Sequence, residues 1–176
     1  NCCIQYFRLR EVSKTNTFIL QGKKSFSDSK LEQLNFEFNN SNNRKSNISS
    51  NEIYIVASQN KNLDLKSLKN ILNADHNLDS FSFIVGPRSG TISPWSSKTE
   101  DIIRNVGIKD VDRVERFNGF NISDEINIDE TDLSMFFDRM TQSIYLNSNE
   151  CINFLNVDPQ RSVSVIDILK GGIKTL

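Results

Sequence analysis

Residues 86–101 read GPRSGTISPWSSKTED and contain two of the three prolines and the only tryptophan of the chain. The preceding residues 81–87, FSFIVGP, are rich in strand-forming side chains, and Gly-Pro ends that strand. Ser97-Lys98-Thr99-Glu100 has the pattern of a capping box, in which the serine and glutamate side chains satisfy backbone N–H groups at the start of a helix. The stretch therefore predicts a connection from a strand to a helix that begins at Ser97.

The residues after this stretch continue the alternation of helix and strand. Ile102, Ile103 and Val106 have the spacing of a buried helical stripe, and Gly107 suits the left-handed position that ends a helix. Residues 111–117, VDRVERF, predict the next strand.

The N-terminal part gives weaker signals. We expect a strand at 3–12, a weak helix at 15–26 and a second strand at 31–38, where residues alternate between apolar and polar. Residues 39–51, NNSNNRKSNISSN, contain almost nothing that can bury apolar surface. They predict a flexible loop.

Three further elements complete the pattern. Residues 52–58 predict a strand, and a helix carrying leucines at helical spacing follows with Asp64 as its N-cap. Residues 133–144 place Leu133, Phe136, Phe137, Met140 and Ile144 along one helical face. This pattern predicts a long amphipathic helix whose phenylalanine and methionine side chains lie in the core.

The order of these elements predicts an α+β fold. Two βαββα units with a period of about eighty residues indicate two ferredoxin-like halves, at about 1–78 and 79–147, fused as a pseudo-dimer with antiparallel sheets. Pairing two small units buries more apolar surface than either buries alone. We expect residues 1–147 to form this domain and 148–176 to begin a linker domain.

Composition excludes several classes of function. The net charge of −1 lacks the basic excess of a dedicated nucleic-acid binder, and no apolar run approaches the length of about 20 residues that spans a membrane. The chain has one histidine and three cysteines without a CxxC pair, which is little material for a metal site. His76 has no nearby partner that would make it a catalytic base. The N-terminus lacks signal-peptide features, and together these observations predict a cytoplasmic protein.

The stretch at 86–101 supports two interpretations. It is either a rigid connector, or a site where donors around the start of a helix bind an anion or a neighbouring protein surface. The spacing of a Walker phosphate loop is absent. The candidate interface or anion-binding residues are Arg88, Thr91, Ser93, Trp95, Ser96, Ser97 and Lys98.

Four ordered motifs resemble one family. GPRSGTISPWSSKTEDI is similar to the N-terminal signature of the large phosphoribosylformylglycinamidine synthases, also called formylglycinamide ribonucleotide amidotransferases. Residues 105–107 with 111–116, residues 138–141 (DRMT) and residues 165–172 (VIDILKGG) match later motifs of that family in order. The chain departs from the usual pattern with Ser89 for proline, Phe117 for glycine, Phe137 for histidine and Lys170 for glycine. These departures argue against direct catalytic duty.

The resemblance implies a non-catalytic part of a longer ligase of purine biosynthesis. In such an enzyme, a central synthetase region binds ATP and Mg²⁺ and acts on formylglycinamide ribonucleotide, and a C-terminal glutaminase region uses a cysteine nucleophile. The N-terminal domain resembles a fused pair of the small subunits of the split enzyme, and it bridges the linker, synthetase and glutaminase parts. Two alternatives remain open, a free-standing phosphate- or small-ligand-binding module and a catalytically dead scaffold paralogue.

Overall fold

The computed structural model describes residues 16–75, 80–127 and 131–155, and within these ranges the fold is α+β, as predicted. One antiparallel sheet has the strand order β1-β2-β4-β3-β5. The strands are β1 (Asn16–Lys24), β2 (Ile48–Ser58), β3 (Phe83–Pro87), β4 (Val111–Ile122) and β5 (Gln142–Tyr145). The helices are α1 (Asp28–Asn42), α2 (Leu65–Leu72), α3 (Pro94–Asn105) and α4 (Ser148–Leu155), with a 3-10 turn η1 (Ser134–Phe136).

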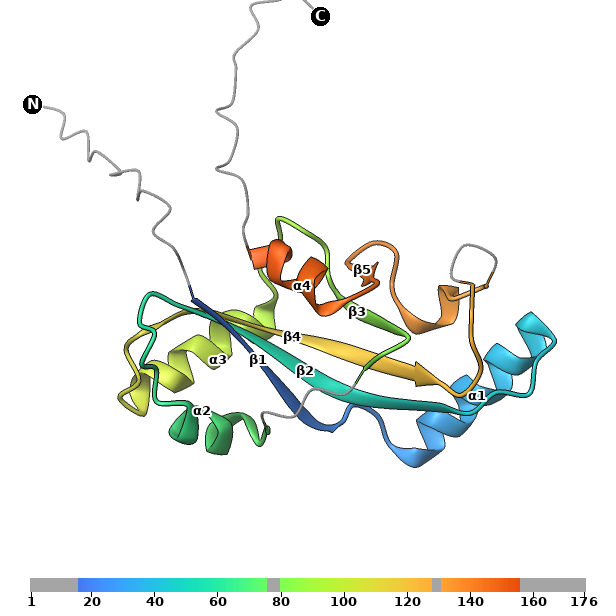
Figure 1. Ribbon diagram of the computed structural model, residues 1–176, viewed down its shortest axis with the longest axis horizontal. Helices are drawn as coiled ribbons and strands as arrows, with labels where there is room; N and C mark the ends of the chain where they lie inside the picture. The colour runs from blue at the N-terminus through green and yellow to red at the C-terminus, as the bar shows by residue number, and fades with distance from the viewer. Residues whose placement is uncertain (1–15, 76–79, 128–130, 156–176) are drawn as a thin grey trace, which may run out of the picture.

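The long strands β2 and β4 form the centre of the sheet (Figure 1). They pair antiparallel from Ile48 opposite Ile122 to Ser58 opposite Val111. On one side β1 pairs with β2, and α1 connects these two strands; on the other side β3 pairs with β4, and α3 connects them. The same strand-helix-strand arrangement therefore occurs once on each side of the central pair.

The sheet is covered on both faces, because side chains alternate along each strand. Tyr54 and Val56 of β2 belong to a hydrophobic cluster that includes Ile103 of α3. Ile53 faces the other way and packs with Cys151 of α4. The first cluster also contains Leu68 of α2. Helix α4 therefore lies on the opposite side of the sheet from α2 and α3, and Figure 1 shows α1 on the side of α2.

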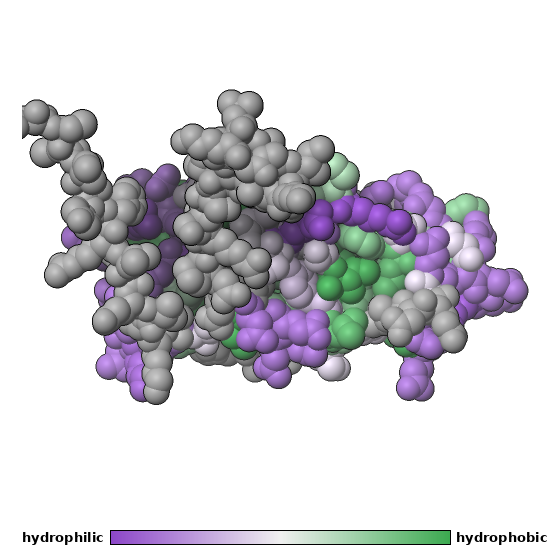
Figure 2. All heavy atoms as spheres, turned by 90° about the horizontal axis from the view of Figure 1, so that it is seen from above, coloured by the Kyte–Doolittle hydropathy of each residue, from purple (hydrophilic) through white to green (hydrophobic). Residues whose placement is uncertain are grey.

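Several large apolar side chains stay outside these clusters. Seen from above, a patch of hydrophobic residues lies right of the middle of the view, with hydrophilic residues beside it (Figure 2). The large hydrophobic residues with the greatest exposure are Phe36, Ile92, Ile102, Val106, Met140 and Leu146. The predicted stripe of α3 is thus only partly correct, since Ile103 is buried whereas Ile102 and Val106 are exposed.

Two N-terminal predictions are wrong. The predicted helix at 15–26 is largely strand β1, and the predicted strand at 31–38 lies in helix α1. Ser27 caps α1 by accepting a hydrogen bond from the Lys30 N–H, and its buried residues follow helical spacing at Leu31, Leu34 and Phe38. The alternation that suggested a strand includes Phe36, whose side chain faces solvent at 68% exposure.

The predicted flexible loop at 39–51 is also wrong over most of its length. Residues 39–42 form the last turn of α1 and residues 48–51 begin β2. The connection is held by asparagine side chains: Asn39 Oδ1 accepts from the Ser46 N–H (2.8 Å) and Asn35 Oδ1 accepts from the Ile48 N–H (2.7 Å). These side-chain amides satisfy backbone groups and so order the polar connection. Ile48, the one large apolar residue of the segment, is buried at 3% exposure.

The long helix predicted at 133–144 is replaced by η1, a turn and β5. Asp138 causes the break, because its carboxylate accepts hydrogen bonds from the Met140 N–H (2.8 Å) and the Thr141 hydroxyl (3.0 Å). After this turn, β5 pairs antiparallel with β3 at the edge of the sheet. Leu133 and Phe136 are buried as expected, but Met140 is 80% exposed and does not belong to the core.

The other elements agree with the sequence. The strand at 52–58 lies in β2, the helix capped by Asp64 is α2, and the strand at 111–117 lies in β4. Gly107 has a positive φ of 99°, as a helix-ending glycine requires. The predicted strand at 3–12, His76 and most of the predicted linker segment 148–176 lie outside the described residues.

Gly86 and Phe117 allow a test of the packing between β3 and β4. A Cβ at residue 86 would collide with the ring of Phe117, which is 1% exposed and packs edge-on against Tyr145. We expect Gly86→Ala to lower the free energy of unfolding by about 1–3 kcal/mol, measured by urea denaturation. In a Phe117→Ala background the same change should cost much less, and an equal cost in both backgrounds would contradict this account.

Candidate functional site

Helix α3 begins at Pro94, three residues before the predicted start. Ser93 is the N-cap, and its Oγ accepts a hydrogen bond from the Ser96 N–H (3.0 Å). Proline suits the first helical position because its ring fixes φ and its missing N–H needs no partner there. Ser97, the predicted N-cap, is an exposed residue inside the helix. The predicted capping box is therefore wrong, and the side chain of Glu100 instead accepts from the Ser96 hydroxyl (3.0 Å).

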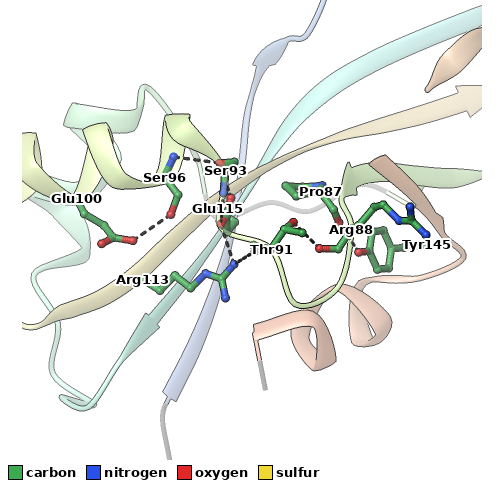
Figure 3. A network of polar contacts seen from close by, with 9 residues as sticks. All are labelled: Pro87, Arg88, Thr91, Ser93, Ser96, Glu100, Arg113, Glu115 and Tyr145. Carbon is green, nitrogen blue, oxygen red and sulfur yellow. Dashed lines mark hydrogen bonds and ion pairs between the residues drawn. The ribbon is translucent and has the colours of Figure 1, made fainter. Parts of the chain in front are cut away.

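Residues 88–93, which we call the Ser93 loop, are anchored by a fully buried carboxylate on β4 (Figure 3). Glu115 accepts hydrogen bonds from the Ser93 N–H (3.2 Å) and the Ser93 hydroxyl (2.7 Å). Arg113 Nη2 donates to Glu115 (2.8 Å) and to the Thr91 carbonyl (2.5 Å). Since a buried charge is costly unless it is paired and hydrogen-bonded, these contacts make the position of the loop and that of Glu115 depend on each other.

Glu115 occupies the place where an external anion would meet the start of α3. A helix N-terminus attracts negative charge through its dipole and its N–H groups. Here the N–H of Ser93 is taken by Glu115, and that of Ser96 by the Ser93 side chain. An external anion would have to use other donors, such as the exposed Arg88 and Lys98.

A second set of contacts holds the start of the loop, where β3 ends. The Tyr145 hydroxyl donates to the carbonyl of Pro87 (2.5 Å), and the Arg88 N–H donates to the carbonyl of Thr141 (3.1 Å). Burial raises the pKa of Tyr145 to about 12, so its hydroxyl keeps the proton that it donates at neutral pH. The Ser93 loop is thereby held to β4 at its end and to the turn before β5 at its start.

A groove of about 400 Å³ opens beside the Ser93 loop. Its walls are formed by the end of β3, by residues 91–95 and by residues 140–142, and Arg116 and Asn118 of β4 also line it. Three sequence motifs that are separate along the chain, at 86–101, 111–116 and 138–141, therefore meet at one surface. Ile92 and Met140 are largely exposed at this groove, at 65% and 80%.

Arg116 supplies the charge in the groove. Its guanidinium lies over the ring of Trp95, 5.2 Å from the ring centroid, and forms a 3.4 Å ion pair with Glu52. Glu52 also accepts a 2.5 Å hydrogen bond from Tyr54, whose ring stacks on Trp95. Burial, and next the hydrogen bond to Glu52, raise the pKa of Tyr54, so that it remains a donor. The Arg116 side chain is 43% exposed, and its contacts with the Trp95 ring and with Glu52 hold it in position.

The predicted site residues separate into three groups. Thr91, Ser93 and Trp95 line the groove. Ser96 is buried and serves α3, through its N–H to Ser93 and its hydroxyl to Glu100. The remaining three, Arg88, Ser97 and Lys98, are exposed beside the groove and do not line it.

Sequence reasoning did not assign roles to Glu115, Arg113 or Arg116. The signal for the first two was present, because Arg113 and Glu115 lie two residues apart and share a strand face with Phe117. Phe117 is 1% exposed, so charges on its face had to be paired inside the protein. No sequence signal indicates that Arg116, on the opposite face, would meet Trp95.

None of the described residues that line the groove is a cysteine, histidine, aspartate or glutamate. Cys151 is fully buried on the other side of the sheet, and burial raises the pKa of its thiol to about 12. The described residues also include no group of three His, Cys, Asp or Glu side chains that could hold a metal ion. No helix in the described ranges has both the length and the apolar character needed to cross a bilayer.

The anchoring role of Glu115 predicts distinct stabilities for three variants. Glu115→Gln should lower the free energy of unfolding by about 3 kcal/mol, because it leaves Arg113 partly buried without its charge partner. Ser93→Ala should cost about 1 kcal/mol or more, because it removes both the cap and a bond to Glu115. Ser97→Ala is the matched control and should cost less than about 0.5 kcal/mol. Urea denaturation measures all three, and a Ser97→Ala effect as large as that of Ser93→Ala would place the cap at Ser97.

Cys151 should be unreactive in the folded protein. Its raised pKa keeps the thiol protonated at pH 8, and burial excludes reagents. In a Cys2→Ser, Cys3→Ser variant, we expect negligible alkylation by iodoacetamide at pH 8 until urea unfolds the chain. Rapid labelling without urea would show that α4 does not cover the sheet.

Comparison with protein families agrees with this arrangement of motifs. Residues 51–154 match the family described as formylglycinamide ribonucleotide amidotransferase N-terminal. The match includes most of β2, all of β3, β4 and β5, the Ser93 loop and every residue that lines the groove. It covers more than half of the 176 residues. The chain therefore belongs to the N-terminal domain family of formylglycinamide ribonucleotide amidotransferases.

Proposed function

We propose that this chain is the docking and assembly domain of an amidotransferase that converts formylglycinamide ribonucleotide to formylglycinamidine ribonucleotide. The observation that carries this proposal is the meeting of three family motifs at one groove with exposed apolar side chains and one fixed arginine. Exposed apolar surface framed by polar groups is typical of a site that contacts another protein surface. In this proposal, the groove faces the synthetase and glutaminase parts of the enzyme and couples them.

The chemistry belongs to other parts of the enzyme in this proposal. The described residues supply neither a carboxylate cluster for Mg²⁺ nor an accessible cysteine nucleophile. ATP, Mg²⁺, glutamine and formylglycinamide ribonucleotide would bind elsewhere, and the enzyme would work in the cytoplasm, without nucleic acid or membrane.

The fold supports the further proposal that the domain consists of two fused ferredoxin-like repeats. The units β1-α1-β2 and β3-α3-β4 have the same order and the same antiparallel pairing. Their second strands pair antiparallel at the centre of the sheet, as expected for two copies related by a twofold axis. Such an arrangement joins both repeats into one sheet, and residues of β3 and β4 from this sheet line the groove.

Docking through the groove predicts a selective loss of glutamine-dependent activity. In the full-length enzyme, Ile92→Ser should lower glutamine-dependent synthesis by about tenfold, or about 1.4 kcal/mol of coupling, with a smaller effect on ammonia-dependent synthesis. Lys98→Ala should shift the ratio of the two activities in the same direction. Ammonia supplied from solution bypasses the glutaminase, so the ratio isolates coupling from synthetase chemistry.

Two exposed residues away from the groove provide controls. Phe36→Ser removes an equally exposed apolar side chain from α1, and Lys45→Ala removes an exposed lysine. Both should leave the ratio unchanged. If Ile92→Ser and Lys98→Ala also leave it unchanged, the Ser93 loop is only a connector and the docking proposal fails.

A further inference from the structure

We infer that the groove receives an acidic side chain from another segment of the enzyme, with its carboxylate on Arg116 and an adjacent apolar side chain between Ile92 and Met140. This inference rests on the proposed docking function and specifies the chemistry of the partner.

Around the groove, the carboxylates are buried or already hydrogen-bonded, whereas the cationic side chains reach solvent. The carboxylates of Glu52 and Glu115 face inward, with side-chain exposures of 10% and 0%. Asp138 is exposed, but both of its oxygens accept hydrogen bonds inside its own turn. The side chains that reach solvent from residues 86–98 and from Arg116 include three cations and no carboxylate. The accessible surface is therefore complementary to a negative group.

Arg116 has unused capacity for a carboxylate. A guanidinium has five N–H donors, and within the described residues the guanidinium of Arg116 makes one hydrogen bond, the 3.4 Å contact to Glu52. Glu52 is already engaged by Tyr54 on its other oxygen. Trp95 and Glu52 hold the guanidinium in place before any partner arrives, which lowers the entropy lost when a bidentate pair with a carboxylate forms.

The apolar borders of the groove favour a protein segment over a small free anion. Ile92 and Met140 lie on two different segments that line the groove and expose 65% and 80% of their surface. An inorganic anion on Arg116 would leave both exposed to water. A segment that carries an apolar residue next to its carboxylate would bury them and satisfy Arg116 at the same time.

Photo-crosslinking in the full-length enzyme tests this inference. With p-benzoylphenylalanine at position 92, we expect irradiation to give an intramolecular product. Mass spectrometry should locate the attachment within two residues of an aspartate or glutamate outside residues 16–155. The same probe at Phe36, an exposed apolar residue of α1, should give at most one tenth of that yield.

A matched pair of charges at Met140 tests the sign of the partner. Met140 is 80% exposed, so either charge is compatible with folding. Met140→Glu should lower the crosslink yield at position 92 by about tenfold through repulsion, whereas Met140→Lys should lower it by no more than about twofold. The Phe36 probe in both backgrounds reports any general change of structure.

Each alternative outcome overturns the inference in a recognisable way. Attachment to a peptide without a carboxylate, or equal losses with glutamate and lysine, would exclude an acidic partner while leaving docking intact. A crosslink between two copies of the chain would show self-association at the groove. No attachment above the Phe36 level would show that no segment occupies the groove. The crosslink reports occupancy and the activity ratio reports coupling, so failure of one is distinguishable from failure of the other.

Discussion

The buried carboxylate of Glu115 is the constraint on which the local structure depends. An unpaired carboxylate in this position would be strongly disfavoured, so the folded state requires Arg113 and both donors of Ser93 to be in place. The same Ser93 side chain caps α3, which links the start of the helix to the position of β4. A single group therefore fixes a strand, a loop and a helix relative to one another, and one wall of the groove is the consequence.

The sequence predicted the fold best where apolar periodicity and capping agreed. Strand β4 and helix α2 with its Asp64 cap were predicted correctly because local signals and tertiary packing favour the same structure. The errors at α1 and at residues 133–144 have one physical cause. In both segments apolar residues fit two periodicities, and polar side chains made the choice: Ser27 by capping a helix, and Asp138 by closing a turn.

The candidate site was predicted in composition and only partly in geometry. Thr91, Ser93 and Trp95 were identified from the density of unusual residues, and all three line the groove. The pairing of Ser93 with Glu115, and of Trp95 with Arg116, joins residues about twenty positions apart through the antiparallel return of β4. Such long-range contacts depend on strand order and register, which residue spacing does not encode. The sequence pattern also predicted Met140 in the core. Its position at the groove follows from the pairing of β5 with β3, which the spacing of apolar residues does not show.

Rigidity of the groove fits the docking function proposed above. Binding between protein surfaces loses free energy when loops and long side chains become ordered, so a surface ordered in advance binds more tightly for the same contact area. The Ser93 loop is tied to β4 through Glu115, and Tyr145 of β5 bonds Pro87 just before the loop. The Arg116 guanidinium rests on the Trp95 ring. The ring of Phe117 fills the space left by the missing side chain of Gly86, which packs β3 closely against β4 next to the groove. The ordering free energy is thus met during folding of the domain. In the proposed docking function, contacts with a partner surface would therefore lose less free energy to the ordering of this loop and of Arg116.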